Sequence, residues 1–235
     1  MSTFLPFPEP QLKATFLERP QRFLADMVLV DGTRTLAYCA NPGSLAGCLQ
    51  PGSPALLWDS LDPGRKRRYT LRAVELQGLW IGTDTHFSNL LAEETLRQGL
   101  LPGLEGYQTL ARERRVEKGS RVDFLLCGSK GSCFVEVKSA TVVEERVARF
   151  PDSVTPRSVK QLEWLARKAA SGERAVLLFV VQRGDAEAFT INWKHSRAYA
   201  EAFKGASAAG VEVFALATRV RAKGFERPRL LPFQL

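Results

Sequence analysis

The stretch RVDFLLCGSKGSCFVEVKSA, residues 121–140, decides the fold of the second half of the chain. Apolar residues dominate its two ends, and the polar, glycine-containing segment 128–132 between them is typical of a hairpin turn. We therefore expect antiparallel strands over 121–127 and 133–140. Both strands carry ionisable side chains among large apolar residues, a combination that is costly in a core unless the charges are paired or bind a metal.

The ionisable residues of this hairpin are Asp123, Glu136 and Lys138. Side chains alternate between the two faces of a strand, so Glu136 and Lys138 share a face. With the turn centred between residues 130 and 131, Asp123 is expected opposite Lys138 and close to Glu136. A Glu-x-Lys triplet alone is also common on a solvated strand face, but the placement of Asp123 and an acidic helix before it favour a built site.

The chemistry of these three residues predicts a divalent-metal site. Two carboxylates, completed by water and phosphate oxygens, suit Mg²⁺ or Mn²⁺. A metal held by Asp123 and Glu136 neutralises a phosphodiester and activates a bound water. The ammonium of Lys138 is then available to orient that water or to stabilise charge developing on phosphate. The spacing Asp-x(12)-Glu-x-Lys therefore indicates catalysis on nucleic acid.

Helical and strand patterns alternate around this hairpin. We expect helices over 84–99, 155–171 and 196–209, and further strands over 108–116, 175–182 and 211–217. Thr155 is placed to cap its helix, with Pro156 at the first helical position. The almost wholly apolar segment 175–182 predicts a central strand. This order predicts a mixed sheet with helices on both faces.

Residues 12–83 have a different sequence pattern, in which short apolar segments are separated by turns. We expect five strands, over 13–19, 22–30, 33–39, 54–58 and 69–76, and one short helix that Ser44 caps and that runs through Cys48. Short strands at this spacing predict a small closed barrel similar to an OB fold. The expected protein is thus a two-domain α/β (α+β) chain, with a barrel over 1–83 and a mixed-sheet domain over 84–235.

Two further sets of polar residues are candidates for contacting phosphates. One is a run of four cations in the loop between the last two expected barrel strands: Arg65, Lys66, Arg67 and Arg68. The other shares one face of the helix at 155–171 through i, i+3 and i+4 spacing: Arg157, Lys160 and Gln161. Cations grouped in this way bind polyanions, although a solvated loop or helix face has the same composition.

Composition narrows the class of partner and the location. The formal net charge is +8, and residues 151–235 hold 14 of the basic and 8 of the acidic side chains. A basic surface favours polyanions, chiefly nucleic acid or an anionic membrane, although this charge also serves solubility. No apolar run is long enough to span a bilayer, and the first residues show no signal peptide. We therefore expect a cytoplasmic protein without membrane contact.

Other chemistries find little support. The four cysteines form no CxxC motif and only two histidines accompany them, so we expect reduced thiols and no structural zinc site. Dinucleotide-binding and P-loop glycine motifs are absent. No feature of the sequence predicts an oligomeric state.

The sequence resembles the sugar fermentation stimulation protein A (SfsA) family over nearly its whole length. The matching stretches are RPQRFLADMVLVDG (19–32), NPGSLAGCLQPG (41–52), NLLAEETLRQGLLPGLEGY (89–107), SRVDFLLC (120–127), CFVEVKSAT (133–141), FPDSVTPR (150–157) and ERAVLLFVVQ (173–182). The resemblance implies an N-terminal OB-like domain, a C-terminal PD-(D/E)xK nuclease-like domain with a restriction-endonuclease-like core, DNA binding and a link to sugar-metabolism genes.

The resemblance also carries over individual residues. Asp123, Glu136 and Lys138 match the nuclease-like motif in full. The acid of the family's first helix matches Glu94, whereas the position of Glu93 need not be acidic.

The chain departs from the family pattern at two histidines. Tyr38 and Gln161 stand where the family usually has histidine, so roles that those histidines carry are not expected here.

Two functions remain open from the sequence. The first is a Mg²⁺- or Mn²⁺-dependent nuclease acting on DNA or RNA, which the complete acid-acid-lysine set favours. The second is a DNA-binding regulator of sugar-metabolism genes that keeps the nuclease fold without its chemistry, which the family's usual description favours. A carbohydrate-linked enzyme ranks third, because no carboxylate pair with glycosidase geometry is readable.

Overall fold

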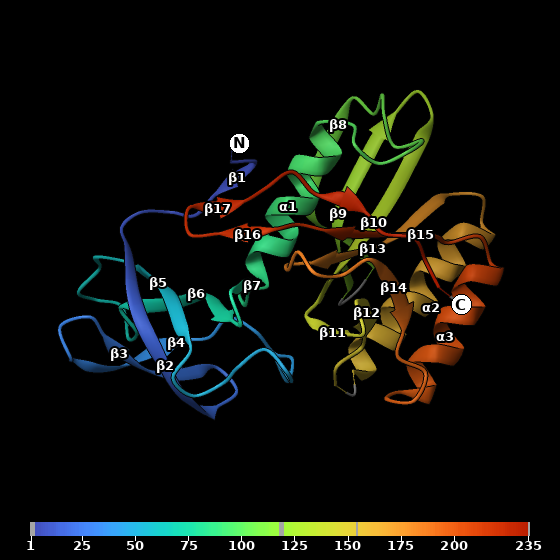
Figure 1. Cartoon of the computed structure of the whole chain (residues 1–235). Coiled ribbons are helices and arrows are strands. Elements are labelled where there is room, and N and C mark those ends of the chain that lie inside the picture. The colour runs from blue at the N-terminus through green and yellow to red at the C-terminus, as the bar shows by residue number, and fades with distance from the viewer. Residues whose placement is uncertain (1–2, 118–119, 154, 235) are drawn as a thin grey trace.

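The computed structural model describes residues 3–117, 120–153 and 155–234. It consists of an N-terminal barrel and a C-terminal mixed sheet with helices on both faces, as the sequence patterns predict (Figure 1). Among the described residues, no helix combines the length and the apolar character needed to cross a membrane.

Six strands build the barrel. They are β2 (Gln11–Gln21), β3 (Leu24–Leu29), β4 (Arg34–Tyr38), β5 (Pro54–Asp59), β6 (Tyr69–Leu76) and β7 (Leu79–Gly82). Their order is β4-β3-β2-β5-β6-β7, and a parallel pairing of Tyr38 with Thr70 joins β4 to β6 and closes the sheet. Alternate residues face the interior, where Ala25, Met27 and Ala37 are fully buried. This alternation explains why a two-residue period in the sequence predicts the barrel.

The short helix expected from Ser44 through Cys48 is wrong. The chain forms turns there, because Leu45 and Gly47 adopt positive φ angles of 54° and 71°, which a right-handed helix cannot contain. The backbone carbonyls of this loop bond instead to the guanidinium of Arg19.

The C-terminal domain is a six-stranded sheet of order β18-β15-β13-β10-β9-β8. Its strands are β8 (Thr109–Glu117), β9 (Ser120–Gly128), β10 (Gly131–Ala140), β13 (Arg174–Val181), β15 (Glu212–Ala217) and β18 (Arg229–Leu230). The strand β13 pairs in parallel with β10 and β15, and its residues from Ala175 to Val181 are all buried. The prediction of a central apolar strand is therefore confirmed.

Three helices cover this sheet: α1 (His86–Arg97), α2 (Pro156–Ala170) and α3 (Arg197–Ala208). Helix α1 packs on one face, where it also meets the barrel, and α2 and α3 pack together on the other face (Figure 1). The Thr155 hydroxyl caps α2 by accepting a hydrogen bond from Ser158 N–H, as its sequence predicts.

The β9–β10 hairpin has a different register from the expected one. Gly128 pairs with Gly131 and Phe124 pairs with Val135, so the turn holds two residues and is centred one residue earlier than predicted. The pairing ends at Phe124 and Val135, and the expected pairing of Asp123 with Lys138 is not formed, because the Asp123 carboxylate accepts a hydrogen bond from the Val137 N–H. The tight turn is possible because Gly131 adopts a φ of 91°, a conformation that glycine tolerates.

Several short strands were not anticipated. The strands β11 (Val142–Glu144), β12 (Val147–Phe150) and β14 (Ala188–Ile191) form a small separate sheet, and β1 (Leu5–Pro6), β16 (Val220–Arg221) and β17 (Gly224–Phe225) form another. Strand β12 ends at Phe150, so the small sheet of β11, β12 and β14 positions the segment that leads into α2.

Candidate functional site

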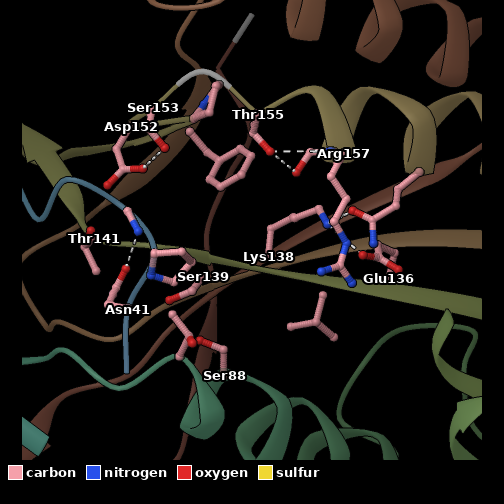
Figure 2. Close-up of a pocket in the computed structure, with 18 of the residues that line it drawn as sticks. Asn41, Ser88, Glu136, Lys138, Ser139, Thr141, Asp152, Ser153, Thr155 and Arg157 are labelled. Carbon is pink, nitrogen blue, oxygen red and sulfur yellow. Dashed lines mark hydrogen bonds and ion pairs between the residues drawn. The ribbon is translucent and has the colours of Figure 1, made fainter. Parts of the chain in front are cut away.

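A cavity of about 470 Å³ lies where the two domains meet. Strand β10 contributes residues 136–139, and the start of α1 and the start of α2 supply two further walls (Figure 2). The barrel closes the remaining side with Arg22 and residues 41–43. The cavity is therefore a composite of both domains, and it contains five of the predicted site residues: Asp123, Glu136, Lys138, Arg157 and Gln161.

Glu136 and Lys138 form an ion pair at the floor of the cavity. The Lys138 Nζ lies 2.6 Å from Glu136 Oε1 and 2.7 Å from Gln161 Oε1. Glu136 is 4% exposed and Lys138 is 9% exposed. Burial raises the pKa of the Glu136 carboxyl to about 7, and the Lys138 ammonium offsets only part of this effect. A carboxyl with such a pKa exchanges its proton near neutral pH.

Asp123 reaches the same site from β9. Its Oδ2 accepts a hydrogen bond from the Val137 N–H at 2.8 Å, and its Oδ1 lies 3.4 Å from the Asn89 amide nitrogen of α1. Burial raises the pKa of the Asp123 carboxyl, and the bond from Val137 opposes this shift. The two carboxylates thus face one cavity from adjacent strands, although the predicted register between them was wrong.

The donor set suits a divalent cation that completes its coordination with water or substrate. Among residues 3–117, 120–153 and 155–234, no group of three or more His, Cys, Asp or Glu side chains is arranged to hold a metal. Mg²⁺ in particular is bound by one or two carboxylates plus waters and phosphate oxygens. Asp123 and Glu136 could therefore hold such an ion, but they do not form a closed structural metal site.

The acids of α1 lie outside this group. The carboxylate of Glu94 accepts a hydrogen bond from Gln98 at 2.7 Å, and Glu93 forms ion pairs with Arg97 and Arg112. Neither acid is among the described residues that line the cavity. Helix α1 contributes Ser88 and Asn89 to the cavity instead. A role for Glu94 at the site stays a prediction.

The predicted phosphate contacts divide into two groups. Arg157 and Gln161 line the cavity, whereas Lys160 is exposed outside it. In Figure 2 the Arg157 side chain extends toward Glu136 and Lys138.

The four cations of the β5–β6 loop are not among the residues that line the cavity. Arg68 forms a bidentate ion pair with Asp59, and Arg65 lies over the Trp58 ring at 5.1 Å. Lys66 is exposed and Arg67 is partly exposed. At least two of the four cations therefore already hold partners within the barrel.

The sequence reasoning missed the barrel's contribution to the site. Asn41 lines the cavity and donates from Nδ2 to the Thr83 carbonyl at 2.9 Å. Ser44 donates from its N–H and its hydroxyl to Asp152 Oδ2, at 2.9 and 3.2 Å. A Cβ on Gly43 would lie only 2.6 Å from Asp152 Oδ2, so a larger residue at position 43 would have to displace this carboxylate. The only signal in the sequence was the turn at 41–44.

Ser139 was also missed. Its hydroxyl lines the cavity, is buried and has no hydrogen-bond partner among the described residues. Such a group is available to a ligand, since a buried polar atom without a partner is costly.

Comparison with known proteins shows the same two-domain organisation. The family model described as the sugar fermentation stimulation protein RE domain matches residues 86–224, and the SfsA N-terminal OB domain model matches residues 17–83. The sugar fermentation stimulation protein homolog of Geotalea uraniireducens is 42% identical over 217 residues, which cover 92% of this chain and 94% of that protein. The homolog of Rhizobium meliloti is 42% identical over 212 residues, 89% of each chain.

A solved structure agrees with these relatives. The structure of Pyrococcus furiosus SfsA in complex with Ca²⁺ superimposes with a TM-score of 0.90 at 30% identity, and the match covers 100% of both chains. The barrel is thus an OB-like domain and the mixed sheet is a restriction-endonuclease-like domain, as the sequence predicts. The chain therefore belongs to the sugar fermentation stimulation protein A (SfsA) family.

Proposed function

We propose that this protein binds DNA and hydrolyses phosphodiester bonds at the site formed by Asp123, Glu136 and Lys138, with Mg²⁺ or Mn²⁺ as the cofactor. The observation that carries the proposal is the buried pair of Glu136 and Lys138 at the floor of a cavity that the half-buried Asp123 carboxylate also lines. Buried charges cost stability unless they are well paired or bind an ion, so their retention beside Asp123 in a cavity supports a catalytic role. The OB and restriction-endonuclease-like domains support nucleic acid as the substrate.

The roles of the residues follow from their contacts. Asp123 and Glu136 would hold the divalent cation, and the Pyrococcus furiosus relative, solved in complex with Ca²⁺, supports an ion of this class. When bound, such a cation neutralises phosphate charge and lowers the pKa of a coordinated water. The Lys138 ammonium, held by Glu136 and Gln161, would donate to the reacting phosphate or to the attacking water. Arg157 would bind a phosphate oxygen at the cavity wall.

Cleavage assays with labelled single-stranded DNA, duplex DNA and RNA test the proposal. Purified protein is expected to cut at least one of these substrates with Mg²⁺ or Mn²⁺ and none with EDTA. Glu136→Gln and Lys138→Met should each lower the rate on the order of 100-fold or more, the usual loss when a transition-state contact is removed. Glu163→Gln on the exposed face of α2 is the matched control and should leave the rate unchanged. Intact substrates under all metal conditions would overturn the proposal.

The second candidate is a DNA-binding regulator without nuclease activity. The exposed Lys66 and partly exposed Arg67 of the barrel favour it, because cations outside the cavity bind phosphates without any need for the carboxylates. This candidate predicts salt-sensitive DNA binding that Glu136→Gln leaves unchanged, together with no cleavage. The cleavage assay above therefore separates the two.

A further inference from the structure

An exposed aromatic pair lies on the barrel. Phe23 is 44% exposed, and among the described residues it is the one aromatic side chain in the group of exposed large apolar residues. Its ring stacks on that of Tyr38, with centroids 6.3 Å apart and an interplanar angle of 24°. Exposed aromatic rings of this kind bury large areas when a flat partner covers them.

The backbone of this pair adjoins residues that line the cavity. Arg22, the residue before Phe23, lines the cavity with an exposed side chain. The Phe23 carbonyl accepts a hydrogen bond from Cys39 N–H at 3.0 Å, and Asn41, two residues further on, also lines the cavity. The segment with Arg22 and Phe23 is thus hydrogen-bonded to the segment 38–41, which carries Tyr38 and the cavity residue Asn41.

The Arg19 side chain joins these two segments by hydrogen bonds. Its guanidinium donates to the Arg22 carbonyl at 3.0 and 2.5 Å, to the Asn41 carbonyl at 2.7 Å and to the Gly43 carbonyl at 2.8 Å. One planar group with several donors therefore ties the segment that carries Arg22 and Phe23 to the loop that walls the cavity. This preorganisation fixes the aromatic pair relative to the candidate site.

The cavity limits what reaches its floor. Its volume of about 470 Å³ falls in the range that holds one small molecule, roughly 300–1,000 Å³. Glu136 at the floor is almost fully buried, and the Ser44–Asp152 hydrogen bonds join the barrel wall to the segment before α2. A space of this size suits one nucleotide of a flexible strand better than a rigid duplex.

We infer that Phe23, Tyr38 and Arg22 form a base-stacking platform that binds single-stranded nucleic acid and leads the strand into the cavity. Bases of a single strand expose their faces to aromatic rings, and such stacking tolerates any sequence. Arg22 supplies the positive charge for the phosphate that follows a stacked base. A duplex hides its base faces, so it cannot use this platform. The inference rests on the proposed function in taking the carboxylate site as the strand's destination.

Fluorescence anisotropy with a labelled oligothymidylate tests the platform in EDTA, where no metal-dependent cleavage occurs. Phe23→Ala should weaken binding of the single strand on the order of 10-fold, the usual loss per stacked base, and Phe23→Trp should restore it. Affinity for a duplex of the same length should stay within about twofold, since a duplex presents no base face to stack. Val30→Ala removes another exposed apolar side chain, at the opposite end of the β3–β4 hairpin, and is the control that should change neither affinity.

Each outcome decides the inference. Unchanged single-strand affinity in Phe23→Ala, or an equal loss for strand and duplex, would overturn it. Thermal unfolding of each variant shows that a loss of binding does not come from misfolding, and Tyr38→Ala provides a second, independent loss of stacking area. A protein that cuts nothing but loses single-strand binding in Phe23→Ala would refute the proposed function and leave the platform standing. If the protein cleaves nucleic acid and Phe23→Ala does not change single-strand binding, the proposed function stands and the platform is refuted.

Discussion

Lowering the pH from 8 to 6 should weaken binding of Mn²⁺ about tenfold, because the metal competes with the proton on Glu136. Burial raises the pKa of this carboxyl to about 7. The ionised fraction is then roughly 90% at pH 8 and roughly 10% at pH 6. A tenfold change in affinity corresponds to about 1.4 kcal/mol. A carboxyl with the ordinary value of 4.5 would be almost fully ionised at both pH values, so its metal affinity would hardly change.

Isothermal titration calorimetry with Mn²⁺ measures this effect directly. Titrations at pH 7 in two buffers of different ionisation enthalpy should also show release of about half a proton per metal bound, the fraction that a group of pKa near 7 still carries. Glu136→Gln should lose most of the affinity and all of this pH dependence. Glu163→Gln, which removes an exposed carboxylate from α2, is the matched control and should titrate like the unchanged protein.

Two results would refute this reasoning. An affinity that is the same at pH 6 and pH 8 would mean that Glu136 is ionised throughout or does not bind the metal. Unchanged Mn²⁺ affinity in Glu136→Gln would exclude this residue as a ligand.

Three further predictions concern stability and binding. The free energy of unfolding of the metal-free protein should fall by about 3 kcal/mol as the pH rises from 4.5 to 7, since folded Glu136 holds its proton to higher pH than the unfolded chain. Urea unfolding checks this, and an equally large decrease in Glu136→Gln would contradict it, since only the raised pKa of Asp123 then contributes at this site. Asp84→Ala should lower the free energy of unfolding by roughly 3–5 kcal/mol, because it leaves the buried Arg72 guanidinium without its partner charge. A loss under 1 kcal/mol in urea unfolding, well below that estimate, would show that the pair is not buried as described. Lys66→Ala should reduce the slope of log affinity for DNA against log salt by about 0.7–0.9, and an unchanged slope in anisotropy titrations would mean that the exposed Lys66 contacts no phosphate.

Patterns local to one element were predictable from the sequence. The helix expected at 155–171 begins with the Thr155 cap and the proline after it, and α2 confirms both. The apolar run of 175–182 became the central strand β13. The shared face of Glu136 and Lys138 needed only the alternation of side chains along a strand. In these cases a few neighbouring residues contain all the information.

Short elements and exact registers were not predictable. The strands β11, β12 and β14 have only three or four residues each, too few for a period to show. The hairpin register depended on whether the turn held two residues or more, and the sequence 128–132 suits either. Turns at 44–48 replaced the expected helix because Leu45 and Gly47 adopt positive φ angles, while Arg19 bonds the carbonyls of Gly43 and Ser44 at the start of this loop.

The sequence by itself determined the chemistry that the site offers: two carboxylates and a lysine within one hairpin, set among apolar residues. Only the tertiary structure decided which other residues share the cavity. Arg22 and Asn41 lie far from Asp123 along the chain, and they meet it because the barrel packs against α1 and the segment before α2. In the same packing Asn89, instead of Glu94, contacts the Asp123 carboxylate. Contacts between domains depend on the shape of both surfaces together, which no local periodicity of one segment specifies.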